Sequence, residues 1–183
     1  MSEDYVVQYC APTLAGIKTG SLFSGYYQSR ADINEEIRAY NKMLRPKGLC
    51  LIPLCYKSGR VLLYLYRPGK LREDLTGEEA VQILKKAGYE KDTPEACLVE
   101  LIRRLNQEEE FPHEIGLFLS YPPEDVRGFI ENRAKNCRCV GTWKVYGDEE
   151  KAKRRFRQYE KCTDIYCKNC KRGFTLDDLA VSC

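Results

Sequence analysis

The sequence predicts an α+β fold, in which a small antiparallel sheet packs against several amphipathic helices. Two β-rich runs, 49–56 and 61–67, are separated by only four residues, which is typical of a hairpin spanning 49–67. Several other segments place apolar residues at helical spacing, so helices outnumber strands. Because the strands of a hairpin are antiparallel, we do not expect a parallel, doubly wound sheet.

The first half of the chain contains a clear amphipathic helix in addition to the hairpin. A helix is expected at 32–45, where apolar residues share one face and Pro46 and Gly48 follow. The residues of this face are Ile33, Ile37, Tyr40 and Leu44. In the hairpin, Gly59 supplies the turn, and Pro53 indicates that its strand lies at an edge or contains a bulge.

The second half of the chain is predicted to be mainly helical. Helices are expected at 76–88, 93–105 and 122–130, each with one apolar face. Residues 112–120 fit either a short helix or a buried strand, and we favour the helix. Residues 140–146 alternate between apolar and polar side chains, which indicates a half-buried strand.

A strongly basic segment follows that strand. Asp148 is expected to begin a helix with Ala152, Phe156 and Tyr159 on its buried face. Residues 133–172 hold 13 Lys and Arg against five Asp and Glu, in a chain whose net charge is only +3. We therefore expect that any partner docking there is an acidic protein. Nucleic acid is not expected, because the helix needs its aromatic residues for its buried face.

Length and composition limit the class of protein. A chain of 183 residues is predicted to form one domain at 1–160, with a basic, cysteine-containing tail at 161–183 packed on or appended to it. Hydrophobic residues make up 43%, which is enough for a core, yet no apolar run approaches the roughly 20 residues of a membrane span. The N-terminus is acidic and lacks the pattern of a signal peptide, so we expect a cytoplasmic protein without membrane contact.

The ten cysteines are the unusual part of the composition. A cytoplasmic protein keeps its thiols reduced, so these residues are core fillers, metal ligands or reactive groups rather than disulfide partners. Cys50, Cys55 and Cys97 lie in apolar patterns, and we expect them to pack in the core.

Cys10 lies in a stretch, 10–23, that has neither helical nor strand periodicity and is expected to be a loop. A nearby ammonium group, for which Lys18 is the candidate, lowers the pKa of a thiol and makes it a nucleophile or a ligand. The alternative is that Cys10 is buried at the end of a first helix.

His113 is the only histidine in the chain. Oriented by Glu114, it is a candidate general base for a cysteine, or it is one metal ligand among thiolates. A structural or surface role for this histidine is the alternative.

Five cysteines near the C-terminus have spacings found in metal sites. Cys167 and Cys170 form a C-x-x-C pair, which is typical of a zinc knuckle when the pair lies in a turn. The full candidate ligand set is Cys137, Cys139, Cys162, Cys167 and Cys170. Thiolate ligands suit zinc or an iron–sulfur cluster. The alternative is a set of reduced cysteines without metal.

The chain resembles a known protein family in three motifs: CAPTLAGIKTGSLF, FPHEIGLFLSYPPEDVRGFIENR and GTWKVYGDEEKA. It resembles a family of uncharacterised bacterial proteins, found largely in anaerobic clostridia, that constitutes a domain of unknown function. The resemblance implies a single cytoplasmic domain of about this length and no particular activity. It directs attention to Cys10, Pro12, Thr13, Gly16, Lys18, Pro112, His113, Glu114, Trp143, Tyr146, Gly147 and Asp148.

Two functions follow from these residues. The first is a thiol-centred redox or transfer function, in which Cys10 and His113 meet in one cleft whose wall includes Trp143 or Tyr146, with Thr13 close by. The second is a non-enzymatic module that binds a metal or a partner through the C-terminal cysteines and the basic helix.

Overall fold

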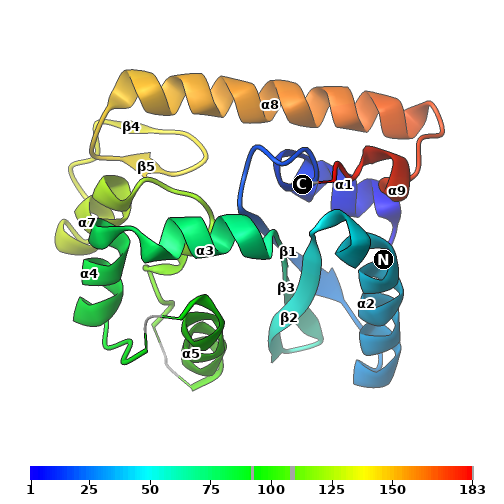
Figure 1. Ribbon diagram of the computed structural model, residues 1–183, viewed down its shortest axis with the longest axis horizontal. Coiled ribbons are helices and arrows are strands. Elements are labelled where there is room, and N and C mark those ends of the chain that lie inside the picture. The colour runs from blue at the N-terminus through cyan, green and yellow to red at the C-terminus, as the bar shows by residue number, and fades with distance from the viewer. Residues whose placement is uncertain (92, 108–109, 183) are drawn as a thin grey trace. The chain divides into compact units, whose positions relative to one another are not determined.

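The computed structural model describes residues 1–91, 93–107 and 110–182, and these residues form an α+β fold (Figure 1). The predicted fold class is therefore confirmed. The chain divides into two compact units. The first unit consists of residues 1–69 and 161–183, and the second consists of residues 70–160. No helix in the described part of the chain is long and apolar enough to cross a membrane.

The first unit contains a three-stranded antiparallel sheet with the strand order β1-β3-β2. The predicted hairpin is confirmed, because β2 and β3 pair through a turn at Ser58 and Gly59, both with positive φ. The register shifts between Pro53 and Cys55 in the edge strand β2, as the proline indicates. The strands are β1 (Gly20–Tyr26), β2 (Cys50–Lys57) and β3 (Arg60–Tyr66).

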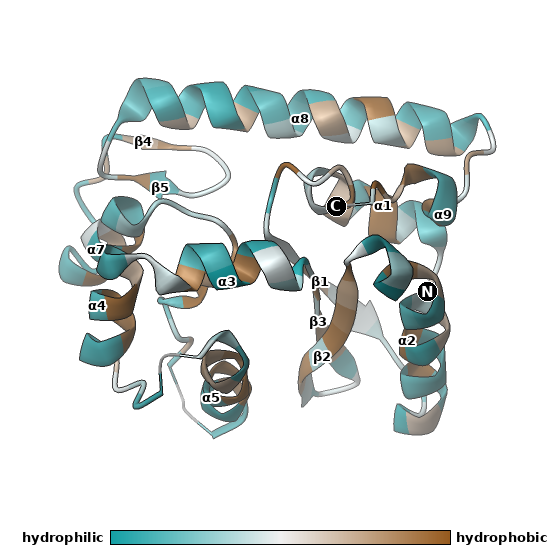
Figure 2. Ribbon diagram, viewed as in Figure 1, coloured by the Kyte–Doolittle hydropathy of each residue, from teal (hydrophilic) through white to brown (hydrophobic). Residues whose placement is uncertain are grey.

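Helices pack against this sheet and form one hydrophobic core with it. Helix α1 contacts β1, and helix α2 contacts β2. Residues 161–183 belong to this unit, because Leu176 and Leu179 are part of the core. Figure 2 shows hydrophobic residues concentrated in the strands and α1. The helical elements are α1 (Glu3–Leu14), α2 (Arg30–Leu44), the 3-10 turn η1 (Arg45–Lys47), the end of α8 and α9 (Leu176–Leu179).

The prediction of a loop over 10–23 is wrong at both ends of that stretch. Residues 10–14 continue α1, and residues 20–23 begin β1. Pro12 lies inside the helix, yet the helix forms because a continuous apolar face is buried on its inner side. This face consists of Val6, Val7, Cys10, Ala11 and Leu14.

A buried arginine closes the C-terminal end of α1. Arg67 is 2% exposed, and its guanidinium donates hydrogen bonds to the carbonyl oxygens of Thr13 (2.8 Å), Leu14 (2.7 Å) and Val181 (2.7 Å). A helix C-terminus leaves carbonyl groups without intrahelical partners, and the last turn of α1 contains no basic residue of its own. Arg67 therefore satisfies these groups and ties the C-terminal segment to α1.

The second unit is mainly helical. Of the predicted helices, the short one within 112–120 is confirmed as α6, and those near 93–105 and 122–130 are confirmed as α5 and α7. In the region 76–88, the helix starts only at Glu78, and the unpredicted helix α3 precedes it. The elements are α3 (Pro68–Thr76), α4 (Glu78–Lys86), α5 (Pro94–Gln107), α6 (Ile115–Phe118), α7 (Pro123–Glu131), β4 (Cys139–Val140), β5 (Lys144–Val145) and α8 (Glu149–Lys171).

The single strand predicted at 140–146 is instead a small hairpin of β4 and β5. The chain reverses at Gly141, whose N–H donates to the Trp143 carbonyl at 3.0 Å. A side chain at Gly141 would clash with the Phe156 ring, since a Cβ there would lie 2.2 Å from it. The glycine thus lets the hairpin approach α8 closely.

The predicted basic helix begins at Glu149, but it does not end near residue 160. Helix α8 continues to Lys171, so the C-x-x-C pair Cys167 and Cys170 lies on a helix and not in a turn. The pair therefore lacks the turn that a zinc knuckle requires, and the first part of the segment 161–183 is helical. Buried contacts explain the longer helix, because Tyr166, Cys167 and Cys170 pack against the core of the first unit.

Candidate ligand-binding site

Asp125 organises the second unit around the β4–β5 hairpin. It lies in the first turn of α7 and is 3% exposed. One carboxylate oxygen accepts a 2.7 Å hydrogen bond from Trp143 Nε1, and the other accepts bonds of 2.7 Å each from the backbone N–H groups of Tyr146 and Gly147. Hydrogen bonds to a buried charge are among the strongest in proteins, so Asp125 fixes the hairpin on α7.

Trp143 is held on both of its sides by aromatic rings. Tyr121 stacks on it with a centroid distance of 4.8 Å, and Phe156 meets it edge-on at 4.5 Å. The indole is only 7% exposed. The Tyr121 hydroxyl donates to the Thr142 carbonyl at 3.4 Å, so the polar atoms of both rings are engaged within the protein. What these residues present to a neighbouring group is therefore apolar surface.

A cavity of about 460 Å³, here called the aromatic cavity, lies next to this cluster. Its volume falls in the range of small-molecule sites, which is about 300–1,000 Å³. Its mouth carries exposed apolar side chains, since Phe111 is 51% exposed and Val140 is 67% exposed. It is lined by Phe111, His113, Ile115, Gly116, Tyr121, Asp125, Val126, Phe129, Val140, Gly141, Thr142, Trp143 and Lys144.

Two polar side chains at the aromatic cavity are arranged around the Phe129 ring. The His113 ring meets it edge-on with a centroid distance of 5.0 Å. The Lys144 ammonium lies 5.9 Å from the centre of the same ring and donates to the Ala134 carbonyl at 2.8 Å. An ammonium group has three N–H donors, so two remain after this bond.

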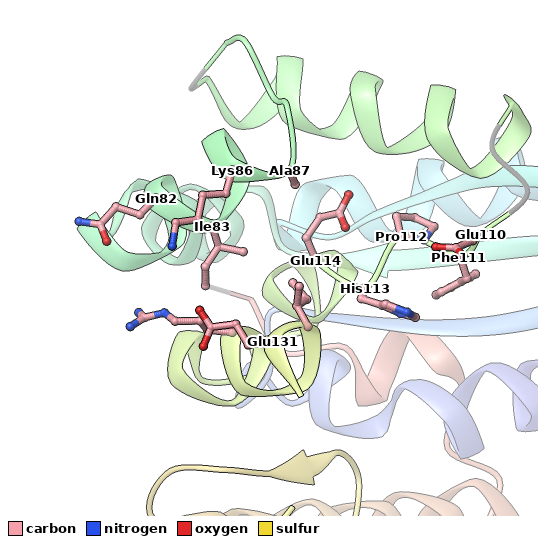
Figure 3. A pocket seen from close by; sticks show the side chains of 12 residues that line it. Gln82, Ile83, Lys86, Ala87, Glu110, Phe111, Pro112, His113, Glu114 and Glu131 are labelled. Carbon is pink, nitrogen blue, oxygen red and sulfur yellow. The ribbon is translucent and has the colours of Figure 1, made fainter. Parts of the chain in front are cut away.

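A second cavity, of about 520 Å³, adjoins the first and is lined by charged groups of both signs. We call it the polar cavity. Figure 3 shows Lys86 and Ile83 extending from α4 and Glu131 projecting from α7. Phe111 and His113 line both cavities. His113 thus stands where an apolar and a charged compartment meet.

Glu114, the predicted partner of His113, is directed elsewhere. The two side chains point in different directions in Figure 3. Glu114 is 5% exposed and accepts a 3.0 Å hydrogen bond from the Tyr89 hydroxyl, with an Arg104 nitrogen at 3.9 Å. Burial, and then the Glu114 charge, raises the pKa of Tyr89 well above its ordinary value. The Glu114 carboxylate is therefore engaged with Tyr89 and not with His113.

Cys10, the predicted nucleophile, is fully buried in the hydrophobic core of the first unit. Burial raises the pKa of its thiol far above the ordinary value, and Lys18 offsets only part of this effect. Lys18 is 9% exposed, and burial lowers its pKa to about 8. The hydroxyl of Thr13 is also buried and shares a 2.9 Å hydrogen bond with Ser21 Oγ.

The predicted cleft between Cys10 and His113 stays a prediction, because the two residues belong to different units. Trp143 and Tyr146, its predicted walls, lie in the same unit as His113. Of these two, Trp143 lines the aromatic cavity.

The proposed metal ligands do not form a site in the described part of the chain. No three or more His, Cys, Asp or Glu side chains there are grouped to hold a metal ion, and its nine cysteines are free thiols. Cys137 and Cys139 belong to the second unit, whereas the three cysteines of α8 belong to the first. Burial, together with a 2.7 Å hydrogen bond to Asp4, raises the pKa of Cys170 to about 11.

Sequence reasoning missed Phe111, Phe129 and Lys144 as site residues. The available signal was the number of aromatic residues between 111 and 146, which exceeds what the apolar faces of two short helices need. Asp125 lies in the segment 122–130, for which the sequence indicates a helix and no site. The turn of the β4–β5 hairpin determines which aromatic rings line the same cavity. The spacing of apolar residues in the sequence does not reveal this turn.

Comparisons with known proteins identify the chain at family level only. Searches of curated proteins and of solved structures gave no significant match. The model of the family DUF3793, described as a protein of unknown function, matches residues 6–180. The match covers nearly the whole chain, including every residue that lines the two cavities. The chain therefore belongs to the DUF3793 family of proteins of unknown function.

Proposed function

We propose that this protein binds a small organic molecule, and that the aromatic cavity of the second unit holds the apolar part of that molecule. The observation that carries the proposal is a cavity of ligand size whose aromatic walls have their polar atoms already hydrogen-bonded within the protein. An apolar ligand loses nothing by covering such walls, because no polar atom is deprived of water.

The exposed apolar residues at the cavity mouth support the same proposal. Phe111 and Val140 are both more than half exposed. Leaving such side chains in water costs free energy, at about 25 cal/mol per Å² of apolar surface. A ligand that covers them removes this cost, so they contribute to binding in a way that a purely structural role does not explain.

A thiol-centred reaction has less support. Such a reaction needs a thiolate that a substrate can reach, and Cys10 is fully buried with a raised pKa. The proposed function is therefore binding, with His113 as a residue that borders the ligand and not as the base of a Cys10 nucleophile.

A second candidate is the docking of an acidic protein on the basic helix α8. Arg154 and Arg157 are exposed and lie about one helical turn apart. In the described part of the chain, Lys153 is the basic residue of α8 with an ion pair, to Glu149 and Glu150. Reversing Arg154 and Arg157 to Glu should abolish retention on an immobilised polyglutamate. Unchanged retention would remove this candidate.

Ligand binding in the aromatic cavity is tested by a thermal-shift screen of small molecules that carry an aromatic or branched apolar group. The test variant is Phe111→Ala, since this side chain lines the cavity yet is half exposed. The matched control is Phe174→Ala in the first unit, where the phenylalanine is 49% exposed. Hits should lose their effect in Phe111→Ala and keep it in Phe174→Ala. Hits that respond equally to both variants would contradict the proposal.

A further inference from the structure

We infer that the ligand of the aromatic cavity is an apolar monocarboxylate, an acid with an aromatic or branched hydrocarbon body, whose carboxylate pairs with Lys144. This inference rests on the proposed function and names the class of ligand for the same site. It follows from which polar groups of the cavity remain available to a ligand.

Among the described residues that line the aromatic cavity, the one carboxylate, Asp125, is not available to a ligand. Both oxygens of Asp125 already accept hydrogen bonds, one from the Trp143 indole and the other from the backbone N–H groups of Tyr146 and Gly147. The side chain is also almost fully buried. Within the described wall of the cavity, a cationic ligand would therefore find no free anion, which disfavours amines.

The cation of the cavity is available. Lys144 makes a single hydrogen bond within the described part of the chain, to the Ala134 carbonyl, and keeps two N–H donors. Its ammonium lies at the Phe129 ring, which is itself a wall of the cavity. A carboxylate at this position would form charge-assisted hydrogen bonds next to the apolar surface that receives its hydrocarbon body.

The number of charges limits the ligand to a monoanion. Of the lining residues that the structure describes at the aromatic cavity, Lys144 is the one lysine or arginine. The His113 ring, which meets Phe129 edge-on, adds an N–H donor. Phosphate groups, which carry about two negative charges, are normally held by arginine or by several cations.

The adjoining polar cavity does not provide an alternative position for the ligand charge. Its lining includes Lys86 and Arg127, but also Glu110 and Glu131. The Arg127 guanidinium is moreover 3.2 Å from a Glu79 carboxylate oxygen. In the described lining of this cavity, three carboxylates stand against two cations, because Glu114 also borders it. The polar cavity therefore does not favour an anion, which leaves Lys144 as the selective group.

The test compares three compounds with the same body and different head groups: 3-phenylpropionate, 3-phenylpropanamide and 3-phenylpropylamine. Dissociation constants are measured by calorimetry on the full chain. The carboxylate should bind at least about tenfold more tightly than the amide, since one charge-assisted hydrogen bond is worth about that factor. The amine should bind most weakly, because its ammonium would approach that of Lys144.

Two variants of Lys144 test whether this residue causes the preference for the carboxylate over the amide. Lys144→Gln should bring the carboxylate and the amide to the same affinity, whereas Lys144→Arg should keep the preference. Lys151→Gln, an exposed lysine of α8, is the matched control and should change nothing. The unmodified protein already tests the ligand class if Lys144→Gln does not fold.

These measurements distinguish a failure of the inferred ligand class from a failure of the proposed function. Equal affinities of carboxylate and amide for the unmodified protein, or an undiminished preference in folded Lys144→Gln, would overturn the inference and leave the proposed function standing. Failure of all three compounds and of every screened molecule to bind would overturn the proposed function itself.

Discussion

The hydroxyl of Tyr89 donates a 3.0 Å hydrogen bond to the carboxylate of Glu114, and both residues are buried, with 4% and 5% of their surface exposed. Because of this contact, Glu114 and its sequence neighbour His113 have different roles. Glu114 is engaged in the interior beside Tyr89 and Arg104, while His113 lies between two cavities. The Phe-Pro-His-Glu segment therefore combines one structural residue with one that borders a ligand site.

The Tyr89–Glu114 contact should contribute measurably to stability. Tyr89→Phe removes the donor to a buried charge, and we expect it to lower the free energy of unfolding by about 1–3 kcal/mol. Tyr146→Phe is the matched control, because the Tyr146 hydroxyl is buried without a hydrogen-bond partner among the described residues. It should be neutral or slightly stabilising. Urea denaturation measures the free energy of unfolding of both variants. An equal decrease in the two would contradict the stabilising role of the Tyr89–Glu114 contact.

Asp125 should be the most sensitive polar residue of the second unit. In Asp125→Asn the amide retains one oxygen acceptor but places N–H donors opposite either the Trp143 indole or the hairpin backbone. We expect a loss of about 3 kcal/mol in the free energy of unfolding. Asp148→Asn, at an exposed helix cap that accepts from the Lys151 N–H, should cost less than about 1 kcal/mol. If the two variants are equally stable, Asp125 does not hold the hairpin.

Lys18 should make stability depend on pH. Its pKa is about 8 in the folded protein against an ordinary value of 10.5, so between these pH values the unfolded chain binds more protons at this site. The contribution of Lys18 to stability therefore rises with pH across that window. The stability difference between Lys18→Met and the unmodified protein should change by about 3 kcal/mol between pH 7 and pH 10. The exposed control Lys57→Met should show a constant difference.

A difference for Lys18→Met that stays constant over the same pH range would contradict the lowered pKa. The Cys10 thiol does not interfere with this comparison. Lys18 lowers the pKa of this buried thiol, so Lys18→Met raises it further, but the folded protein keeps the thiol protonated up to pH 10 in both cases. The loss of stability that the thiol causes above pH 9 is therefore the same in the unmodified protein and the variant.

Cys10 should be inert toward alkylation in the folded protein. Because the thiol is fully buried with a raised pKa, iodoacetamide at pH 7.5 should modify it no faster than the protein unfolds. The half-buried Cys137 serves as the internal reference and should react first. Peptide mass spectrometry over time distinguishes the two sites. Modification of Cys10 as fast as Cys137 would revive the thiol-centred function.

Periodicity and turn chemistry were sufficient for the hairpin 49–67, for the helix α2 and for the start of α8. These elements are set by local patterns, such as Gly59 in the turn and the β-rich runs on either side of it. The stretch 10–23 was missed because Pro12 interrupts the local helix signal, while the burial of Val6 and Cys10 against distant strands stabilises the helix.

The candidate site was predictable only in part. His113 and Trp143 were identified from their residue types, and both line the aromatic cavity. Lys144 and Phe129 were not identified as site residues. They lie close together because of the hairpin turn at Gly141 and the hydrogen bonds of Asp125. Contacts of this kind join residues far apart in sequence, and no local pattern reports them. For Cys10 the residue type left two alternatives open, a reactive thiol or a buried residue of the first helix, and the structure places it in the buried face of that helix.

The central claim, that the aromatic cavity binds an apolar ligand, is tested most directly by nuclear magnetic resonance. Trp143 is the only tryptophan and His113 the only histidine, and both line this cavity, whereas both methionines, Met1 and Met43, belong to the first unit. Titration with 3-phenylpropionate should shift the Trp143 indole N–H and the His113 ring signals together, along one saturation curve, and leave the methionine methyl signals unchanged. Stationary Trp143 and His113 signals at saturating ligand, or shifts confined to the methionines, would contradict the claim.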